Sequence, residues 1–309
     1  MTVSKSTALA KKEGNIFNLA TYKEEKFTLD FAIHEPIHCM TPGLFRSLKK
    51  GDRKKLKLEV IHEFGKGEDK QKVEYYGPEP LGADDLRILQ CTVALAGRNH
   101  KDFVSVNPKS EAGRMLRDNM KLKWDAINEP LIVAKGSFRE LAKEIGWASE
   151  NLTQIQKCLE RLCKVTIFIE SKKRRMMFNL ISGYGNDSRQ DKLFIALNPL
   201  ITRVIFGSDV KHTRIDLCEV RKLSDVAVLL HQRLCSWIDP GAIGKVSLDT
   251  IIEYVWYEKS TNINTIKDRK RRLKMSLLEF EKIQWVVKEY SKDKFSFQRP
   301  IRKSVENKE

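Results

Sequence analysis

The sequence has no hydrophobic run that approaches the eighteen or more apolar residues of a membrane-spanning helix. The N-terminal stretch MTVSKSTALAKKEGN contains no apolar core, so we expect no secretory signal. A GxxxxGK[ST] loop is also missing, and Gly65-x-Gly67 has no dinucleotide-binding pattern behind it. These absences argue against a membrane protein and against a nucleotide-dependent helicase or ATPase, and we expect no cofactor.

Cysteine is sparse and forms no metal-binding or redox motif. None of the six cysteines stands in a CxxC pair, and most lie among apolar neighbours, which is typical of reduced, buried thiols in a cytosolic protein. His34, His38 and Cys39 are close enough to suggest part of a metal site. Structural zinc takes four protein ligands, however, and no second ligand pair follows. We therefore expect no metal.

The sequence also lacks a catalytic constellation. A rolling-circle nicking enzyme needs two histidines one residue apart on a strand, and the closest pair here is His34 and His38. Asp84 and Asp85 could be drawn as metal ligands, but their place at the start of a predicted helix favours interaction with the helix dipole. We predict that the protein is not an enzyme.

Positive charge is what the sequence has in excess. The 309 residues include 57 Lys and Arg against 41 Asp and Glu, which gives a net charge of +16. With 41% hydrophobic residues the chain can bury a core, and its length suggests two domains. Such a protein favours a polyanionic partner, with nucleic acid first and an anionic membrane surface second.

Residues 261–283 form the strongest single pattern. Apolar residues at Ile263, Ile266, Leu273, Leu277 and Phe280 predict one buried stripe of a helix. The face turned away from it is polar and basic, and its candidate DNA-binding residues are Ser260, Asn264, Lys267, Arg271 and Lys274, with Asp268 and Arg272 beside them. Arg can read a guanine edge and Asn an adenine edge, whereas Lys mostly neutralises phosphate. The alternative is a basic face that only solvates the helix.

The surroundings of this helix favour the DNA-binding interpretation. Residues 245–254 predict a short strand and a helix capped by Ser247. Two strand-like runs, 284–289 and 294–298, follow the basic helix. Helix, turn, basic helix and hairpin is the order of a winged helix-turn-helix.

A second block of the same kind precedes the first. A strand at 131–134 leads to a capping box at Ser137 and Glu140, a helix through Ile145, and a second helix capped by Ser149. A hairpin, 165–170 and 176–181, completes the block. Its candidate DNA-binding residues are Thr153, Gln154, Lys157, Arg161 and Lys164 on the outer helix face, and Lys172, Lys173, Arg174 and Arg175 at the hairpin tip.

The two capping serines, Ser137 and Ser247, lie about 110 residues apart, which suggests an internal duplication. We therefore predict an α+β fold of two tandem winged-helix domains. The expected units are a mobile basic arm (1–30), an N-terminal domain (31–185), a C-terminal domain (191–300) and a basic tail (301–309). Further predicted elements are helices at 44–50, 83–96, 110–122 and 224–238 and strands at 57–64, 72–76, 193–197 and 214–216.

Four stretches of the chain resemble a known family. They are HCMTPGLFRSLKKGDRKKLKLEV (38–60), GPEPLGADDLRILQ (77–90), KGSFRELAKEIG (135–146) and LLHQRLCSWIDPGAIGKVSLDTIIEYVW (229–256). These segments are similar to the RepC replication initiators of IncQ-type broad-host-range plasmids, and the similarity runs from about residue 34 to 300. The longer N-terminal arm and the hairpin tip at 172–175 depart from that family.

The resemblance implies a bacterial cytoplasmic protein that binds direct repeats, the iterons, in double-stranded DNA at a plasmid origin. It further implies opening of an adjacent AT-rich segment, cooperation with a plasmid-encoded helicase and primase, and a homodimer that pairs through residues 44–96. Two other functions stay open. One is a winged-helix transcriptional regulator, and the other is a nicking replication protein or relaxase.

Overall fold

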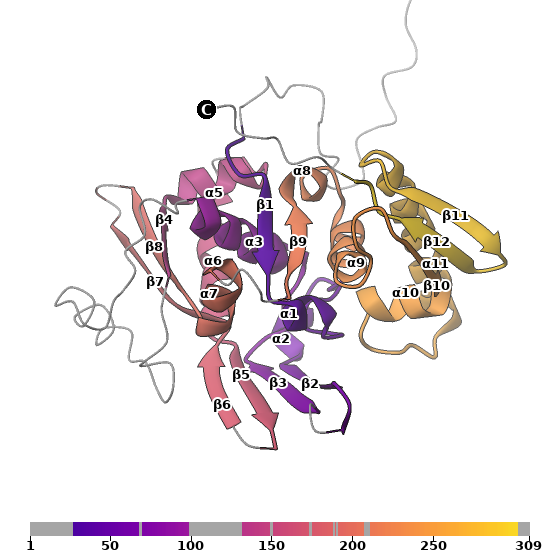
Figure 1. Ribbon diagram of the computed structural model, residues 1–309, viewed down its shortest axis with the longest axis horizontal. Coiled ribbons are helices and arrows are strands. Elements are labelled where there is room, and N and C mark those ends of the chain that lie inside the picture. Colours follow the sequence, from indigo (N-terminus) through magenta and orange to yellow (C-terminus); the bar gives the residue numbers. More distant parts are fainter. Residues whose placement is uncertain are drawn as a thin grey trace, which may run out of the picture.

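The computed structural model describes residues 27–67, 70–98, 132–148, 151–172, 175–187, 189, 191–206 and 211–301 (Figure 1). Most of the expected N-terminal arm, the predicted helix at 110–122 and all of the C-terminal tail but Ile301 lie outside these residues. None of the helices described is both long enough and apolar enough to cross a membrane.

The fold is a mixed α and β arrangement in which several small antiparallel sheets are covered by helices. The N-terminal elements are β1 (Phe31–His34), α1 (Pro36–Met40), α2 (Asp52–Lys55), β2 (Leu58–Phe64), β3 (Gln71–Gly77) and α3 (Ala83–Arg98). The predicted strands at 57–64 and 72–76 and the helix at 83–96 are thereby confirmed.

The helix predicted at 44–50 is wrong. Gly43 has a left-handed φ of +80°, and the chain then runs without helical hydrogen bonds. The Arg46 amide donates to the Leu81 carbonyl and the Ser47 amide to the Val255 carbonyl. Because two distant segments accept these amide protons, tertiary contacts replace the local helix.

The central part of the chain is β4 (Val133–Gly136), α5 (Phe138–Glu144), α6 (Leu152–Cys163), β5 (Thr166–Ser171), β6 (Arg175–Asn179), β7 (Ile181–Asp187) and β8 (Lys192–Leu197). Ser137 begins α5 as predicted, since its Oγ accepts a hydrogen bond from the Glu140 amide at 3.0 Å. Asn151 is the N-cap of α6, and Ser149 lies outside the described residues.

The C-terminal part is α7 (Pro199–Phe206), β9 (Thr213–Asp216), α8 (Leu217–Val220), α9 (Asp225–Cys235), β10 (Ile243–Ser247), α10 (Leu248–Val255), α11 (Ile263–Glu281), β11 (Val286–Ser291) and β12 (Lys294–Gln298). Ser247 caps α10 through a bond from the Thr250 amide at 3.2 Å. The helices and strands predicted between 193 and 298 are all present, with small shifts at their ends.

Two of the sheets have the same strand order. In one, β4 lies beside β8 and β8 beside β7; in the other, β10 lies beside β12 and β12 beside β11. Each sheet is completed by a pair of helices, α5 and α6 or α10 and α11, that follows its first strand in the chain. The preceding helices, α3 and α9, pack against α6 and α11 respectively.

The hairpin β5–β6 belongs to neither of these sheets. It extends a third sheet in the order β2-β3-β5-β6, through pairs such as Val73 with Ile169. The strand pair that occupies the position of β11–β12 is instead β7–β8. The hairpin predicted at 165–181 is thus present as β5–β6. The expectation that it completes the first block, as 284–298 completes the second, is wrong.

The N-terminal and C-terminal parts of the chain are joined closely. β1 pairs with β9 in antiparallel register, from Phe31 opposite Asp216 to His34 opposite Thr213. A single hydrophobic core runs through both parts. The boundary expected at 185–191 falls between β7 and β8, inside one sheet.

Candidate nucleic-acid interface

Helix α11 presents one face to the core and one to solvent. Asn262 caps it, because its Oδ1 accepts hydrogen bonds from the Asn264 and Thr265 amides at 2.9 and 3.1 Å. Leu273, Leu277 and Phe280 are buried as predicted. Ile263 is 68% exposed, so its expected place in the buried stripe is wrong. The first turn of the helix extends beyond the core that its later turns cover.

The predicted basic face of α11 is exposed. Asn264, Lys267, Arg271 and Lys274 all face solvent. Arg271 donates to the Asp268 carboxylate at 2.8 Å, a surface pair one turn apart on the helix. Such an exposed pair contributes little stability and leaves the guanidinium accessible to a ligand. Met275 and Leu278, which the sequence reasoning passed over, are also exposed and continue this face toward the C-terminus.

Two other predicted contacts lie at the margin. Ser260 precedes the helix, and its Oγ accepts from the Asn262 amide at 3.3 Å. The Arg272 guanidinium lies 5.5 Å from the centre of the Trp256 ring, and that of Arg269 lies 5.6 Å from the same ring. The indole thus lies against the guanidinium groups of both arginines in the first half of α11, and Arg272 is only half exposed.

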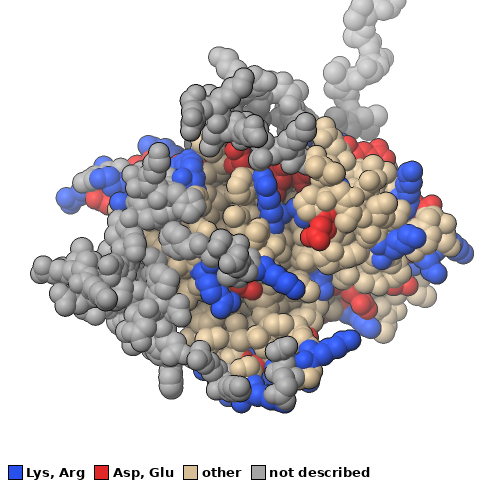
Figure 2. Space-filling model, viewed as in Figure 1, with Lys and Arg blue, Asp and Glu red and all other residues tan. Residues whose placement is uncertain are grey.

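The β11–β12 hairpin adds cations beside this helix. Asp293, at its tip, lies 3.7 Å from both Lys270 and Lys274 and so ties the hairpin to α11. Lys288, Lys292 and Lys294 are exposed along it. Figure 2 shows Lys and Arg gathered over the right-hand end of the molecule, where β11 and β12 lie in Figure 1. These lysines were absent from the predicted set, although the basic run KDK at 292–294 was a visible signal.

On α6 the predicted residues separate into two groups. Thr153, Lys157 and Lys164 are exposed. The side chain of Arg161 is only 7% exposed, and the Gln154 amide donates to Asp84 Oδ2 at 2.8 Å. The expected place of Arg161 on the outer face is therefore wrong, because buried carboxylates from α3 accept its N–H groups.

Asp84 and Asp85 form the centre of a buried ionic network. Asp85 accepts from Arg161 Nε and Arg53 Nη2, each at 2.8 Å, and from the Gly82 amide at 2.8 Å. Burial and the neighbouring Asp84 charge raise the pKa of Asp85 to about 6, against the opposing effect of the two arginines. Together with Cys158 these carboxylates are close enough to hold a metal ion, but arginine and amide donors already occupy their oxygens. The geometry supports a helix-to-helix connection rather than a cation site.

At the tip of the β5–β6 hairpin, Lys172 and Arg175 are exposed, and Lys173 and Arg174 lie outside the described residues. The Arg175 guanidinium lies 5.4 Å from the Phe168 ring centre. Since this hairpin belongs to the β2-β3-β5-β6 sheet, its cations are not placed beside α6 in the way that the cations of β11–β12 are placed beside α11.

The suggested metal corner is a buried apolar site. His38 Nδ1 lies 2.9 Å from the Tyr75 hydroxyl. Burial lowers the pKa of His34 to about 4 and that of His38 to about 3, so both rings are neutral near pH 7. Within the described part of the chain, these residues do not form a group with metal-ligand spacing.

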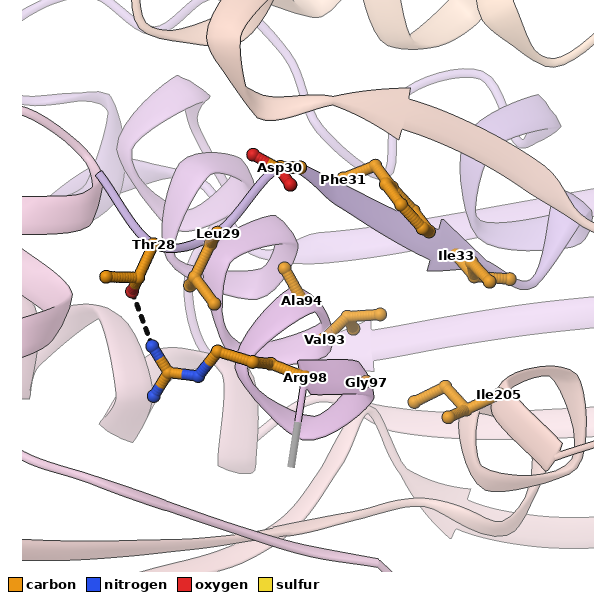
Figure 3. Close-up of a pocket in the computed structure, with 10 residues that line it drawn as sticks. All are labelled: Thr28, Leu29, Asp30, Phe31, Ile33, Val93, Ala94, Gly97, Arg98 and Ile205. Atoms are coloured by element: carbon orange, nitrogen blue, oxygen red, sulfur yellow. Dashed lines mark hydrogen bonds between the residues drawn. The ribbon is translucent and has the colours of Figure 1, made fainter. Parts of the chain in front are cut away.

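A pocket of about 230 Å³ lies between β1 and the C-terminal end of α3 (Figure 3). Most of the residues around it are apolar, among them Leu29, Phe31 and Val93, and Arg98 donates to the Thr28 hydroxyl at one end. Ligand sites usually combine an apolar wall with several convergent polar groups. This pocket has few such polar groups, and we assign no ligand or reaction to it.

Comparison with known proteins finds a family model that matches the sequence and solved structures with a similar fold. A family model described as replication protein C (RepC) matches residues 26–301. No curated protein matches the chain. A crystal structure of RctB domains 2–3 (residues 155–483) aligns with a TM-score of 0.51 at 9% identity and covers 85% of this chain and 95% of that one. A second structure of RctB domains 2 and 3 aligns with a TM-score of 0.49 at 10% identity, covering 83% and 95%.

Proposed function

The chain belongs to the replication protein C (RepC) family, and on that premise we propose that it initiates plasmid replication by binding direct repeats in double-stranded origin DNA. Two winged helix-turn-helix units perform the binding, with α6 and α11 as their recognition helices. The observation that carries this proposal is the solvent-exposed row of Asn264, Lys267, Arg271 and Lys274 on a capped helix beside a basic hairpin. A helix of this kind fits the major groove, where Arg and Asn can reach base edges.

The two-unit arrangement is supported by the shared strand order of β4-β8-β7 and β10-β12-β11. Under this proposal β7–β8 is the wing of the first unit and β11–β12 that of the second. Successive major grooves on one side of DNA are about 34–36 Å apart, so one chain could engage both. β8 lies in the expected second domain, 191–300, but pairs with β4 of the expected first domain, 31–185. The two expected domains therefore share one sheet.

Roles within the site follow from side-chain chemistry. Arg271, planar and in the middle of the helix, contacts a guanine edge, and Asn264 near the N-terminus contacts an adenine. Lys267 and Lys274 bind phosphate, as do Lys157 and Lys164 on α6 and the exposed lysines of the β11–β12 hairpin. Thr153 and Ser260 supply hydroxyl donors at the helix starts.

The remaining steps concern partners. We propose that the bound protein opens an adjacent AT-rich segment, recruits a plasmid-encoded helicase and primase in the bacterial cytoplasm, and binds DNA as a monomer that exchanges with a homodimer. Light scattering on a single repeat tests the stoichiometry. Two protomers on each repeat would contradict monomer binding.

The test of the function is a footprint on the cognate origin. Protection that recurs with each tandem repeat supports an initiator, whereas protection of a lone palindrome in front of a gene supports a transcriptional regulator. A supercoiled plasmid incubated with the protein and a divalent metal addresses the enzymatic alternative. A covalent tyrosyl-DNA product would identify a nicking enzyme and overturn the proposal.

A further inference from the structure

A cluster of exposed lysines stands outside both predicted DNA-binding blocks. Residues 49–57, KKGDRKKLK, form a turn around the short helix α2, and we name this segment the α2 lysine turn. Its lysine side chains are all exposed; they are Lys49, Lys50, Lys54, Lys55 and Lys57. Among the described residues, none of their ammonium groups forms an ion pair. Such a concentration of uncompensated charge is unfavourable in isolation and favours an anionic partner.

The α2 lysine turn is linked to α6 through the first residues of α3. Arg53 lies within the turn and donates to the Asp84 and Asp85 carboxylates. The same two carboxylates accept from Arg161 and Gln154 of α6. On the helix, Arg161 borders the exposed face that carries Lys157 and Lys164. The turn and the first proposed recognition helix therefore share the same two carboxylates of α3.

The residues just before the turn, 43–47, are attached to the connection between α10 and α11. Arg46 forms an ion pair with Glu258, and the Ser47 amide donates to the Val255 carbonyl at 2.8 Å. At Gly43, a Cβ atom would lie only 2.4 Å from the Tyr257 ring, so only glycine permits the observed approach of the two segments. Residues 255–258 precede α11, which begins at Ile263, and in the view of Figure 1 α2 lies below α6 and α10 and horizontally between them.

The α2 lysine turn is thus linked to both proposed recognition helices, to α6 through α3 and to α11 through residues 43–47 and 255–258. We propose that it is a third DNA contact, which binds the sugar–phosphate backbone of the segment that separates the two major grooves. Lysine suits this role because its ammonium group neutralises phosphate without the planar fork needed for bidentate base reading. The inference rests on the proposed DNA-binding function and adds a sequence-independent contact to it.

The test compares two double variants of the full chain on duplex DNA that carries the origin repeat. Lys54→Ala with Lys55→Ala removes charge from the turn, and Lys143→Ala with Lys222→Ala removes the same charge from exposed sites on α5 and after α8. Each lost phosphate contact lowers the slope of log K against log salt by about 0.9, so the turn variant should lose about 1.8. The affinity should fall by roughly an order of magnitude, equally for cognate and scrambled DNA, and the control should match wild type.

Ethylation interference then locates the contact. In wild type, modification of phosphates between the two half-sites should interfere with binding, and this signal should vanish in the turn variant alone. A turn variant with wild-type slope and interference pattern would overturn the third contact, while loss of base preference in Arg271→Ala would still uphold the proposed function. If wild type itself shows no salt-dependent binding to the repeat, the proposed function fails and the third contact with it.

Discussion

Arg271 and Arg161 stand on the second helix of their respective helix pairs, and both were expected to face DNA. Arg271 is exposed and pairs only with Asp268 on its own helix. Arg161 is buried and pairs with Asp84 and Asp85 of α3. Arg161 thus serves tertiary structure, whereas Arg271 stays accessible for the recognition role that we propose, and each role has its own measurable consequence.

We predict that Arg271→Ala weakens binding to the cognate repeat by about 1–3 kcal/mol and flattens the preference at one base position. Lys274→Ala should weaken binding to all sequences about equally and reduce the salt slope by about 1. Binding titrations on single-base variants of the repeat measure both effects. A uniform loss for Arg271→Ala across those variants would mean that it contacts phosphate, and no loss for either would place recognition elsewhere.

We predict that Arg161→Ala lowers the free energy of unfolding by about 3–5 kcal/mol, because it leaves the Asp85 carboxylate buried without one of its cations. Lys157→Ala, an exposed position on the same helix, should change stability by less than about 0.5 kcal/mol and should lower the salt slope of DNA binding instead. Urea unfolding of both variants separates the two roles. Equal stability of the two would show that the buried network is not formed.

Acid should destabilise the protein below about pH 6.5. Burial lowers the pKa of His34 to about 4 and of His38 to about 3, so the folded state keeps both rings neutral while the unfolded chain protonates them. Each contributes stability that is present above pH 6.5 and lost as the pH falls toward the folded pKa, at about 1.4 kcal/mol per pH unit. His231, with a pKa raised to about 10, is protonated in the folded state throughout this window, so below about pH 6.5 it contributes a constant stability and little pH dependence. Asp85, with a pKa raised to about 6, takes up a proton in the folded state below that pH and offsets part of the loss.

Urea midpoints measured between pH 7 and 5 test this dependence. His38→Asn keeps a polar atom near the Tyr75 hydroxyl but cannot titrate, so its midpoint should fall less steeply with acid. An unchanged slope in this variant would assign the acid sensitivity to other groups.

At the scale of elements, the two basic hairpins differ in their neighbours. β11–β12 packs beside α11 and is tied to it through Asp293, whereas β5–β6 extends the sheet that starts with β2. We predict that Lys288→Ala with Lys292→Ala lowers the salt slope of DNA binding by up to about 2. Lys172→Ala with Arg175→Ala, which removes the same charge from β5–β6, should lower it less. Salt titrations of the two double variants decide, and a larger effect at β5–β6 would restore that hairpin as a DNA contact.

At the scale of the whole molecule, buried polar contacts join the parts of the chain that carry the two proposed winged-helix units. The Glu144 carboxylate, only 1% exposed, accepts from the Thr28 amide and hydroxyl, the Leu29 amide and Arg221. Arg221 also donates to the Leu29 carbonyl at 2.7 Å. These contacts join α5, the residues before β1 and the end of α8, next to the β1–β9 pair. We infer that the spacing between the two recognition helices is rigid.

A rigid spacing makes binding sensitive to the distance between the half-sites. Inserting 5 base pairs between them turns one half-site to the opposite side of the DNA, so only one unit can bind. We predict a loss of roughly 10²–10⁴ in affinity, the usual gain from linking two binding modules. Replacing Lys157 and Lys164 with Ala should weaken the first unit and so lower the affinity for the unmodified site. The insertion should then cost this variant less affinity than it costs wild type. An affinity unchanged by the insertion would contradict simultaneous binding of both units.

The sequence by itself determined the helices and strands whose signals are local. The periodic stripe of α11, the serine caps of α5 and α10 and the turns of the last hairpin predicted those elements and the exposed basic face. A residue's position on an amphipathic helix is set by its nearest neighbours in the chain, so Asn264, Lys267, Arg271 and Lys274 could be placed without a structure.

Only the tertiary structure decided which elements meet. The assignment of β5–β6 to the β2–β3 sheet, the pairing of β1 with β9 and the burial of Arg161 depend on partners between 76 and 185 residues away in the chain, for which a single sequence carries no local signal. The same holds for the lysines at 49–57, which are an unremarkable basic run in the sequence; their position is set by the bonds from Arg53 to Asp84 and Asp85 and from Arg46 and Ser47, just before them, to Glu258 and Val255. Long-range pairing and buried charge set these contacts, because a buried carboxylate must find a cation wherever the chain supplies one.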